Sequence, residues 1–338
     1  FSFIMFYVLA ISAYLLKYLP LRSAGDLSTY IPMIHFLREY GFHGLVPNWY
    51  NGFILFEFYP PGFSFFGLLL HFITNNYGIL IYLALILIYI IGFIGIYLIS
   101  REQKFSWVET SFFFLAFFFN YATVVYVIRL GRFPELLGWS IFTFFFFLML
   151  HYKNRSLGRF SIAIPVVLGI IMLVNVYVFM LSLTLLACLF VIKSRKEKWI
   201  LLLYGATTAA ATSFWWYPFI KIFAGVLFDS GFYKWGVARE LLSWNSIISS
   251  NTAFGLLFII AFLVYIAENN ADENKNDFGF YLPLFILDFL VLTRLVYFVP
   301  ILRNIPTTPY NLLFLFVSIF LLIKIINVKI RRLPVFLN

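Results

Sequence analysis

Long apolar runs alternate with short polar segments along most of this chain. A helix needs about 20 mostly apolar residues to cross a bilayer, and runs near that length recur throughout the sequence. They cover residues 2–19, 79–100, 107–126, 136–152, 160–175, 177–193, 199–220, 253–267, 278–300 and 309–327. The pattern predicts an all-α fold, a polytopic transmembrane helical bundle of about ten or eleven spans.

The remaining apolar run, residues 62–74, is short for a span. The first run is long enough, and it has neither a basic region ahead of it nor a small-residue cleavage site, so we expect a transmembrane helix there rather than a signal peptide. No internal repeat or low-complexity linker divides the chain. Residues 1–338 are therefore predicted to form a single transmembrane domain.

Composition agrees with this prediction and excludes the soluble classes. Apolar residues make up 63% of the chain and charged residues 11%, against roughly 25% charged in a soluble domain. So few charges cannot cover so much apolar surface in water. Disorder is excluded because it requires low hydrophobicity, and a disulfide scaffold is excluded because Cys188 is the single cysteine.

The net charge of +10 predicts an orientation in the membrane rather than nucleic-acid binding, because the basic residues lie mainly in short loops. These loops contain Lys153, Arg155 and Arg159, then Lys193, Arg195, Lys196 and Lys198, and finally Lys329, Arg331 and Arg332. Even numbers of spans separate the three groups, so all of them can face the cytoplasm. Arg101, Lys104 and the acidic loop 268–277 fall on the same side.

The opposite, extracytoplasmic face then collects a consistent set of segments. They are the first loop 20–61, residues 127–135, the helix break near Asn175, the second loop 221–252 and residues 301–308. A full crossing by residues 62–74 would invert the helices that follow. Either this run is a half-membrane or re-entrant segment, or another crossing is misplaced; the sequence leaves both alternatives open.

The first loop contains a stretch with apolar residues at helical spacing, which starts after Asp26 and stops at Gly41. We expect a helix lying on the membrane surface. Asp26 has two interpretations, a cap of this helix or a carboxylate available for chemistry, and the loop alone favours the cap. Trp49, Glu57 and Tyr59 follow, ahead of a double proline that can begin a helix but cannot continue one.

A second segment places Arg129, Arg132 and Glu135 between two very apolar helices. Charges at that depth are costly, and they usually face a cavity or one another. One interpretation is an internal Arg–Glu pair that only locks helix packing. The other is a site where arginine holds a phosphate and Glu135 orients a partner group. Arg303, in a later loop of the same face, is a further candidate cation.

The sequence lacks the motifs of several enzyme classes. The chain has no G-x-x-x-x-G-K-[ST], G-x-G-x-x-G or G-x-S-x-G motif, and its four histidines show no metal-ligand spacing.

Asp288 and Arg294 share one apolar run, but their spacing is not that of facing helical neighbours. We expect Arg294 to point inward or toward the outer surface.

An ordered set of short motifs resembles the GT-C superfamily of integral-membrane glycosyltransferases. The set consists of Gly25-Asp26, Trp49-Tyr50-Asn51-Gly52, Phe58-Tyr59-Pro60-Pro61, Gly131-Arg132 through Glu135, and Phe214-Trp215 through Pro218. The closer resemblance is to bacterial and archaeal membrane proteins labelled 6-pyruvoyl-tetrahydropterin-synthase-related, and it extends to about residue 220. It implies a GT-C-like fold and transfer of a sugar from a polyprenyl-phosphate carrier to an acceptor on the extracytoplasmic face.

The resemblance shifts the preferred role of Asp26 from helix cap to general base for the acceptor hydroxyl. Arg129, Arg132 and Arg303 are the candidates for binding the leaving phosphate. Glu57 and Glu135 are secondary carboxylates that would position the acceptor or a divalent metal, although no metal is required. Tyr59 and Trp49 either stack on sugar or prenyl groups or simply pack the loop.

Two other functions remain open. One is a lipid or polysaccharide transporter, although inverted repeats are absent and the charges gather on one face. The other is a non-catalytic GT-C-like subunit of a larger membrane complex. The partners implied are a polyprenyl-phosphate donor, membrane lipids and other membrane proteins, with no nucleic acid. The location implied is the cell membrane.

Overall fold

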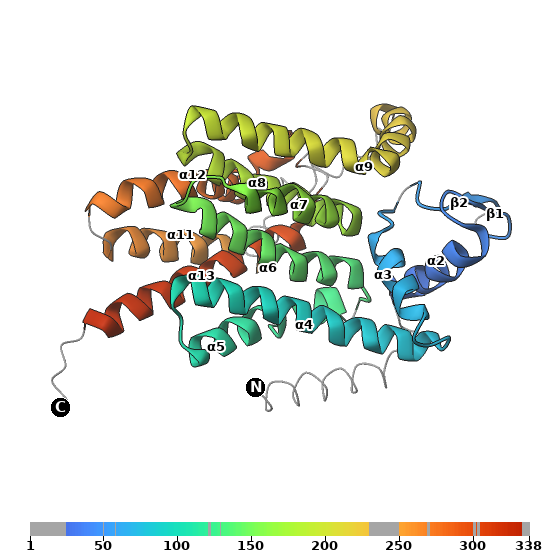
Figure 1. The fold of residues 1–338 in the computed structure, drawn as a ribbon, viewed down its shortest axis with the longest axis horizontal. Coiled ribbons are helices and arrows are strands. Elements are labelled where there is room, and N and C mark those ends of the chain that lie inside the picture. Colours follow the sequence, from blue (N-terminus) through green and yellow to red (C-terminus); the bar gives the residue numbers. More distant parts are fainter. Residues whose placement is uncertain are drawn as a thin grey trace.

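The computed structural model describes residues 25–49, 51–57, 59–120, 123–128, 130–229, 250–268, 271–299, 302 and 305–332. The predicted first span, the central part of the second loop, Arg129 and Arg303 lie outside these residues. The described chain is all-helical apart from two short strands, which confirms the fold class at that level. Figure 1 shows helices running side by side along one long axis, with a smaller unit at one end.

Among the residues that the structure describes, three helices are long and apolar enough to cross a membrane. They are α4 (Tyr77–Gln103), α6 (Phe133–Lys153) and the first part of α13 (Thr307–Arg332). Each coincides with a predicted apolar run. Around them pack α5 (Trp107–Phe118), α7 (Ala163–Val174), α8 (Val176–Ile192), α9 (Arg195–Asp229), α11 (Ser250–Glu268) and α12 (Ala271–Leu292).

Two predicted runs are interrupted. The run 107–126 ends as an α-helix at Phe118, because the Asn120 side chain accepts the Thr123 N–H at 3.0 Å and so competes with the helical ladder. A π-helical turn, η1 (Thr123–Ile128), follows. The run 278–300 ends at Leu292, ahead of a 3₁₀ turn, η4 (Leu295–Phe298). Arg294 before that turn is half-buried and has a positive φ of 63°.

The break expected near Asn175 is confirmed as the junction of α7 and α8. Its side chain caps α8 by accepting the Val178 N–H at 3.0 Å. Gly138 of α6 lies against this junction, since a Cβ on that glycine would come within 3.1 Å of the Asn175 Cβ. The close approach ties the start of α6 to the turn between two other helices.

The smaller unit in Figure 1 contains α2 (Leu27–Tyr40), the hairpin strands β1 (Leu45–Val46) and β2 (Phe53–Ile54), and α3 (Gly62–His71). The strands pair antiparallel, with Leu45 opposite Ile54. α2 is the helix expected after Asp26, and it buries Leu27, Ile34 and Leu37 as its apolar spacing predicts. We call the end of the bundle that carries this unit the near end, and the opposite end the far end.

α3 is too short for the full crossing considered for residues 62–74. Its ten residues extend about 15 Å, half of a hydrocarbon core roughly 30 Å thick. Both α3 and the beginning of α4 lie against α2, where His35 Nδ1 and the Tyr77 hydroxyl are 3.1 Å apart. The segment therefore turns back without traversing the bundle, which agrees with the half-membrane alternative; the orientation of the later helices in a membrane stays a prediction.

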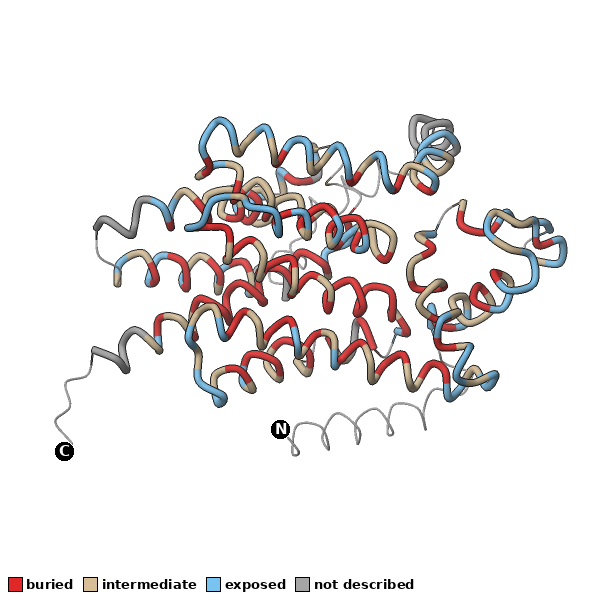
Figure 2. The backbone as a smooth tube through the Cα atoms, viewed as in Figure 1, coloured by how far each residue is buried: buried red, intermediate tan, exposed pale blue. Residues whose placement is uncertain are grey.

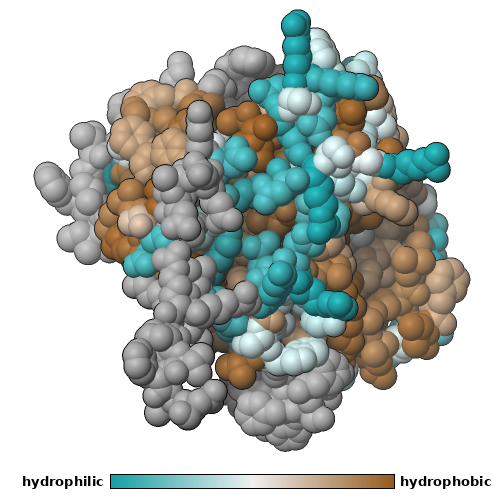
Figure 3. Space-filling view, turned by 60° about the vertical axis from the view of Figure 1, so that its left-hand side comes forward, coloured by the Kyte–Doolittle hydropathy of each residue, from teal (hydrophilic) through white to brown (hydrophobic). Residues whose placement is uncertain are grey.

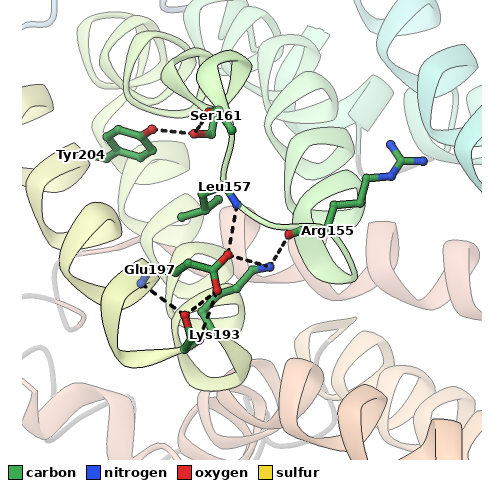
Figure 4. Close-up of polar contacts among 8 residues, drawn as sticks. Arg155, Leu157, Ser161, Lys193, Glu197 and Tyr204 are labelled. Carbon is green, nitrogen blue, oxygen red and sulfur yellow. Dashed lines mark hydrogen bonds and ion pairs between the residues drawn. The ribbon is translucent and has the colours of Figure 1, made fainter.

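The basic loops predicted to share one face do meet at the far end. Lys193 donates to the Arg155 carbonyl, and the Leu157 N–H donates to Glu197 Oε1 at 3.0 Å (Figure 4). Asp277, beyond the acidic loop, pairs with Lys153. In Figure 3 hydrophilic side chains gather over this end, with hydrophobic surface beside them.

The sides of the bundle are apolar where a water-soluble protein would be polar. Ile162, the N-cap residue of α7, and Val166 and Ile170 of that helix follow one another at helical spacing, and all three are exposed. Conversely, Ser140 and Thr143 of α6 are buried. Figure 2 shows buried positions along the central helices and exposed positions on the outer ones. Such an exterior suits a lipid environment.

Candidate functional site

A cluster of charged side chains joins the start of α2 to the start of α6 at the near end. Asp26 Oδ2 lies 3.4 Å from Arg132 Nε, and a second Arg132 nitrogen lies 4.0 Å from Glu135 Oε2. The Asp26 side chain is 54% exposed, whereas Glu135 is buried in the first turn of α6. The structure thus brings together three of the predicted site residues, and one guanidinium group bridges two carboxylates.

Glycines allow the two backbones to meet. The Asp26 N–H donates to the Leu130 carbonyl at 2.9 Å. Gly25 has a positive φ of 51°, and a Cβ there would lie only 2.3 Å from that same carbonyl oxygen. Gly131, with a φ of 70°, turns the chain from Leu130 into α6. Both positions need glycine, because other residues rarely adopt this backbone conformation and Gly25 has no room for a side chain.

Asp26 does not cap α2 with its side chain. It precedes the helix, but its own backbone is already helical, with φ −65° and ψ −17°, and its carboxylate makes no capping hydrogen bond. A capping residue normally has an extended backbone that turns the side chain back to the helix N–H groups. The cap interpretation is therefore wrong in this respect, and the Asp26 carboxylate lies beside Arg132 instead.

Tyr30 lies one helical turn after Asp26 and completes the cluster. Its ring is 6.4 Å from that of Tyr59 and 5.8 Å from that of Phe63. Burial raises the pKa of Tyr30 most, and the nearby Asp26, Tyr59 and Glu135 raise it further, while Arg132 lowers it. Tyr30 therefore keeps its proton near neutral pH and offers a hydroxyl donor. The spacing of four residues from Asp26 is the sequence signal that identifies it.

The loop before α3 contributes unequally to the site. Tyr59 is 41% exposed and borders the cluster through its contact with Tyr30. Trp49 packs instead against Phe36, with ring centroids 4.6 Å apart, which favours its loop-packing role. Glu57 is half-buried and forms no ion pair with any residue that the structure describes.

Trp215 of α9 holds this loop in place. It is buried, and its Nε1–H donates to the carbonyls of Phe56 at 3.1 Å and Tyr59 at 3.0 Å. The start of α3 also lies close against α7, because a Cβ on Gly62 would be only 2.6 Å from the Leu173 carbonyl oxygen. Motifs more than 150 residues apart in sequence thus meet. Trp215 belongs to a motif of the resemblance, and its positioning role comes from the structure.

The charge balance of the cluster limits its chemistry. Two carboxylates share one guanidinium group, so Arg132 is already engaged and the three groups carry no excess positive charge. A phosphate bound here requires cations beyond Arg132. Arg129 and Arg303, the other predicted cations, lie outside the described residues. What the geometry does provide is a solvent-accessible carboxylate held in a fixed position by an arginine.

Metal binding finds no further support in the described part of the chain. No group of three or more His, Cys, Asp and Glu side chains there is arranged to hold a metal ion. Comparisons of the sequence with protein-family models and with curated proteins, and a search of solved structures, find no match.

Proposed function

We propose that this protein is an integral-membrane glycosyltransferase that moves a sugar from a polyprenyl-phosphate carrier to an acceptor on the extracytoplasmic side. The observation that carries the proposal is the Asp26–Arg132–Glu135 cluster at one end of an apolar helical bundle. The order of the motifs that form and surround this cluster, which resembles that of GT-C enzymes, supports the same function.

Asp26 has the role of general base. Its exposed carboxylate accepts a proton from the acceptor hydroxyl, whose oxygen then attacks the anomeric carbon of the sugar. The bond from that carbon to the carrier phosphate breaks, and the phosphate leaves with the electron pair. Arg132 orients the Asp26 carboxylate, and the buried Glu135 holds Arg132 from the other side.

The surroundings suit a substrate with a long lipid tail. The outer sides of the helices are apolar, so a prenyl chain can remain in lipid while its headgroup reaches the near end. Arg129 and Arg303 are assigned to the phosphate, because Arg132 is engaged by carboxylates. Tyr30 and Tyr59 present hydroxyl groups and ring edges at the same place, where a sugar would bind.

The test is a transfer assay with purified protein in liposomes. A panel of polyprenyl-phosphate sugars is supplied with cell-envelope acceptors, and mass spectrometry detects a new glycosidic bond. The proposal predicts a glycosylated product that depends on the prenyl-phosphate donor. Lipid that crosses the bilayer without a new bond would identify a transporter. No transfer with any donor, by a protein that co-purifies with other membrane proteins, would identify a non-catalytic subunit.

A further inference from the structure

Helix α12 carries two buried aspartates in opposite surroundings. Asp277, at its polar start, contacts the ammonium groups of Lys153 and Lys324 and accepts a hydrogen bond from Tyr265. Asp288, three turns later, is 0% exposed, and neither of its carboxyl oxygens has a hydrogen-bond partner. The first is a fully paired carboxylate, and the second lies in an apolar contact between helices.

The contact around Asp288 is close. A Cβ on Gly255 of α11 would lie 2.6 Å from Asp288 Oδ1, and the same Cβ would lie 2.9 Å from a methyl group of Leu292. The carboxyl group therefore occupies the space that the missing side chain of Gly255 leaves open. Water and ions are kept from it by the neighbouring helices, since the whole residue is inaccessible to solvent.

No charged group among the described residues neutralises Asp288. α8, α11 and η4 pack along α12, while α6 and α13 contact it at Asp277 through Lys153 and Lys324. The described ionisable side chains of α8, α11 and η4, together with the residue before η4, are Tyr177, Cys188, Tyr265, Glu268 and Arg294. None of these forms an ion pair or a hydrogen bond with Asp288. An ionised carboxylate without a partner in such surroundings is strongly disfavoured, and a buried acid avoids this cost by keeping its proton.

We propose that Asp288 is a proton-binding site within the helix bundle, occupied at neutral pH, and that the bound proton keeps α11 packed against α12 at Gly255. This inference does not depend on the proposed transferase activity. It follows from the absence of partners around one acid and from the contrast with Asp277, an acid of the same type on the same helix.

A hydrophobic carbodiimide reports this state, because it partitions into lipid, reaches Asp288 when α11 and α12 separate briefly at Gly255, and reacts with protonated carboxyl groups. The acid transfers its proton to a carbodiimide nitrogen, and its oxygen adds to the central carbon. Migration of the acyl group to nitrogen then gives a stable N-acylurea that retains every atom of both reactants. No oxidant, reductant or metal is needed.

The experiment treats the full chain in liposomes with dicyclohexylcarbodiimide and locates the adduct by peptide mass spectrometry. We expect the carbodiimide to label Asp288, and the extent of labelling to fall as the pH is raised. Labelling of Asp288 should exceed that of Asp277 by about tenfold or more, because the Asp277 carboxylate is ionised. A water-soluble carbodiimide should instead modify exposed acids such as Glu39 and leave Asp288 unmodified. The readout needs no variant, so a folding defect cannot obscure it.

Three results would overturn the proposal. The first is an unlabelled Asp288 at neutral pH in protein that retains its native circular dichroism. The second is equal labelling of Asp277 and Asp288, which would mean that pairing does not control the reaction. The third is protection of Asp288 by Na⁺ or K⁺ at constant pH, which would make a cation the ligand instead of a proton.

Discussion

At the scale of single residues, the candidate site depends on a glycine as much as on charged groups. Gly25 combines a positive φ with a backbone contact that leaves no room for a Cβ. Gly25→Ala should lower the free energy of unfolding by roughly 2–4 kcal/mol and impair transfer, because Asp26 would be displaced from Arg132. Thermal unfolding in detergent, followed by the transfer assay, measures both effects.

Gly41 provides a matched control for this substitution. It also has a positive φ, of 75°, but nothing lies within 4 Å of the position a Cβ would take. Gly41→Ala should therefore lower the free energy of unfolding only by the cost of the backbone strain, about 1 kcal/mol. Equal losses in the two variants would show that the contact between Gly25 and Leu130 does not hold the site together.

At the scale of elements, α9 positions the loop between the hairpin and α3 through one indole. Trp215→Phe removes both hydrogen bonds to the carbonyls of Phe56 and Tyr59 but preserves an aromatic ring in the core. We expect faster amide hydrogen exchange in residues 53–59 and a several-fold slower transfer, with the bundle intact. The loss of two hydrogen bonds should cost about 1–3 kcal/mol.

Trp216→Phe is the control for that variant. The Trp216 Nε1–H donates to the Ala209 carbonyl of its own helix at 2.7 Å, so its loss breaks no hydrogen bond to the loop, and phenylalanine keeps an aromatic ring beside it. Exchange in residues 53–59 should then match the wild type. If both variants accelerated exchange equally, the effect would come from a general loosening of α9 rather than from the anchor.

The sequence predicts long apolar helices better than it predicts single side-chain contacts. Apolar runs predicted α4, α6 and α13 well, because length and hydropathy decide such helices. The end of α5 was not predicted, since it depends on one asparagine side chain competing for the backbone. Trp215 belongs to a motif of the resemblance, but its bonding partners are main-chain carbonyls of a distant loop, and no side-chain pattern in the sequence identifies them. The meeting of Asp26 and Arg132 was expected only through the resemblance.

At the scale of the whole molecule, polar and charged side chains around Asp277 join α6, α11, α12 and α13 at the far end. Burial by itself raises the pKa of Asp277, but Lys153, Lys324 and Tyr265 outweigh it and hold the pKa below its usual value. The resulting stability is present above the unfolded pKa of about 4 and is lost as the pH falls through the lower folded value. The melting temperature should therefore drop as the medium is acidified below about pH 4.

Asp277→Asn tests the assignment of this pH dependence. The variant leaves Lys153 without its carboxylate partner at every pH, so it should be less stable than the wild type at neutral pH by roughly 2–4 kcal/mol. Its melting temperature should change less between pH 5 and pH 3 than that of the wild type. An unchanged acid-induced loss in the variant would assign the effect to other carboxylates.

The orientation of the molecule is a further prediction at this scale. The basic far end should face the cytoplasm and the near end the outside. Cys188 is buried and should not react, so labelling reports on the single cysteine that is introduced. A membrane-impermeant maleimide added to intact cells should label Asn48→Cys in the near-end loop, and it should label Lys196→Cys only after permeabilisation. The reverse pattern would place the Asp26 cluster inside the cell.

In the proposed function the Asp26 carboxylate removes the proton from the acceptor during sugar transfer, and the transfer rate of the Asp26→Asn variant measures this role. The variant should fold normally and transfer about 10²–10⁴-fold more slowly than the wild type, with little change in donor binding. Glu39→Gln, which alters another exposed acid of α2 outside the cluster, should transfer at the wild-type rate. Transfer by Asp26→Asn at the wild-type rate would show that Asp26 is not the general base.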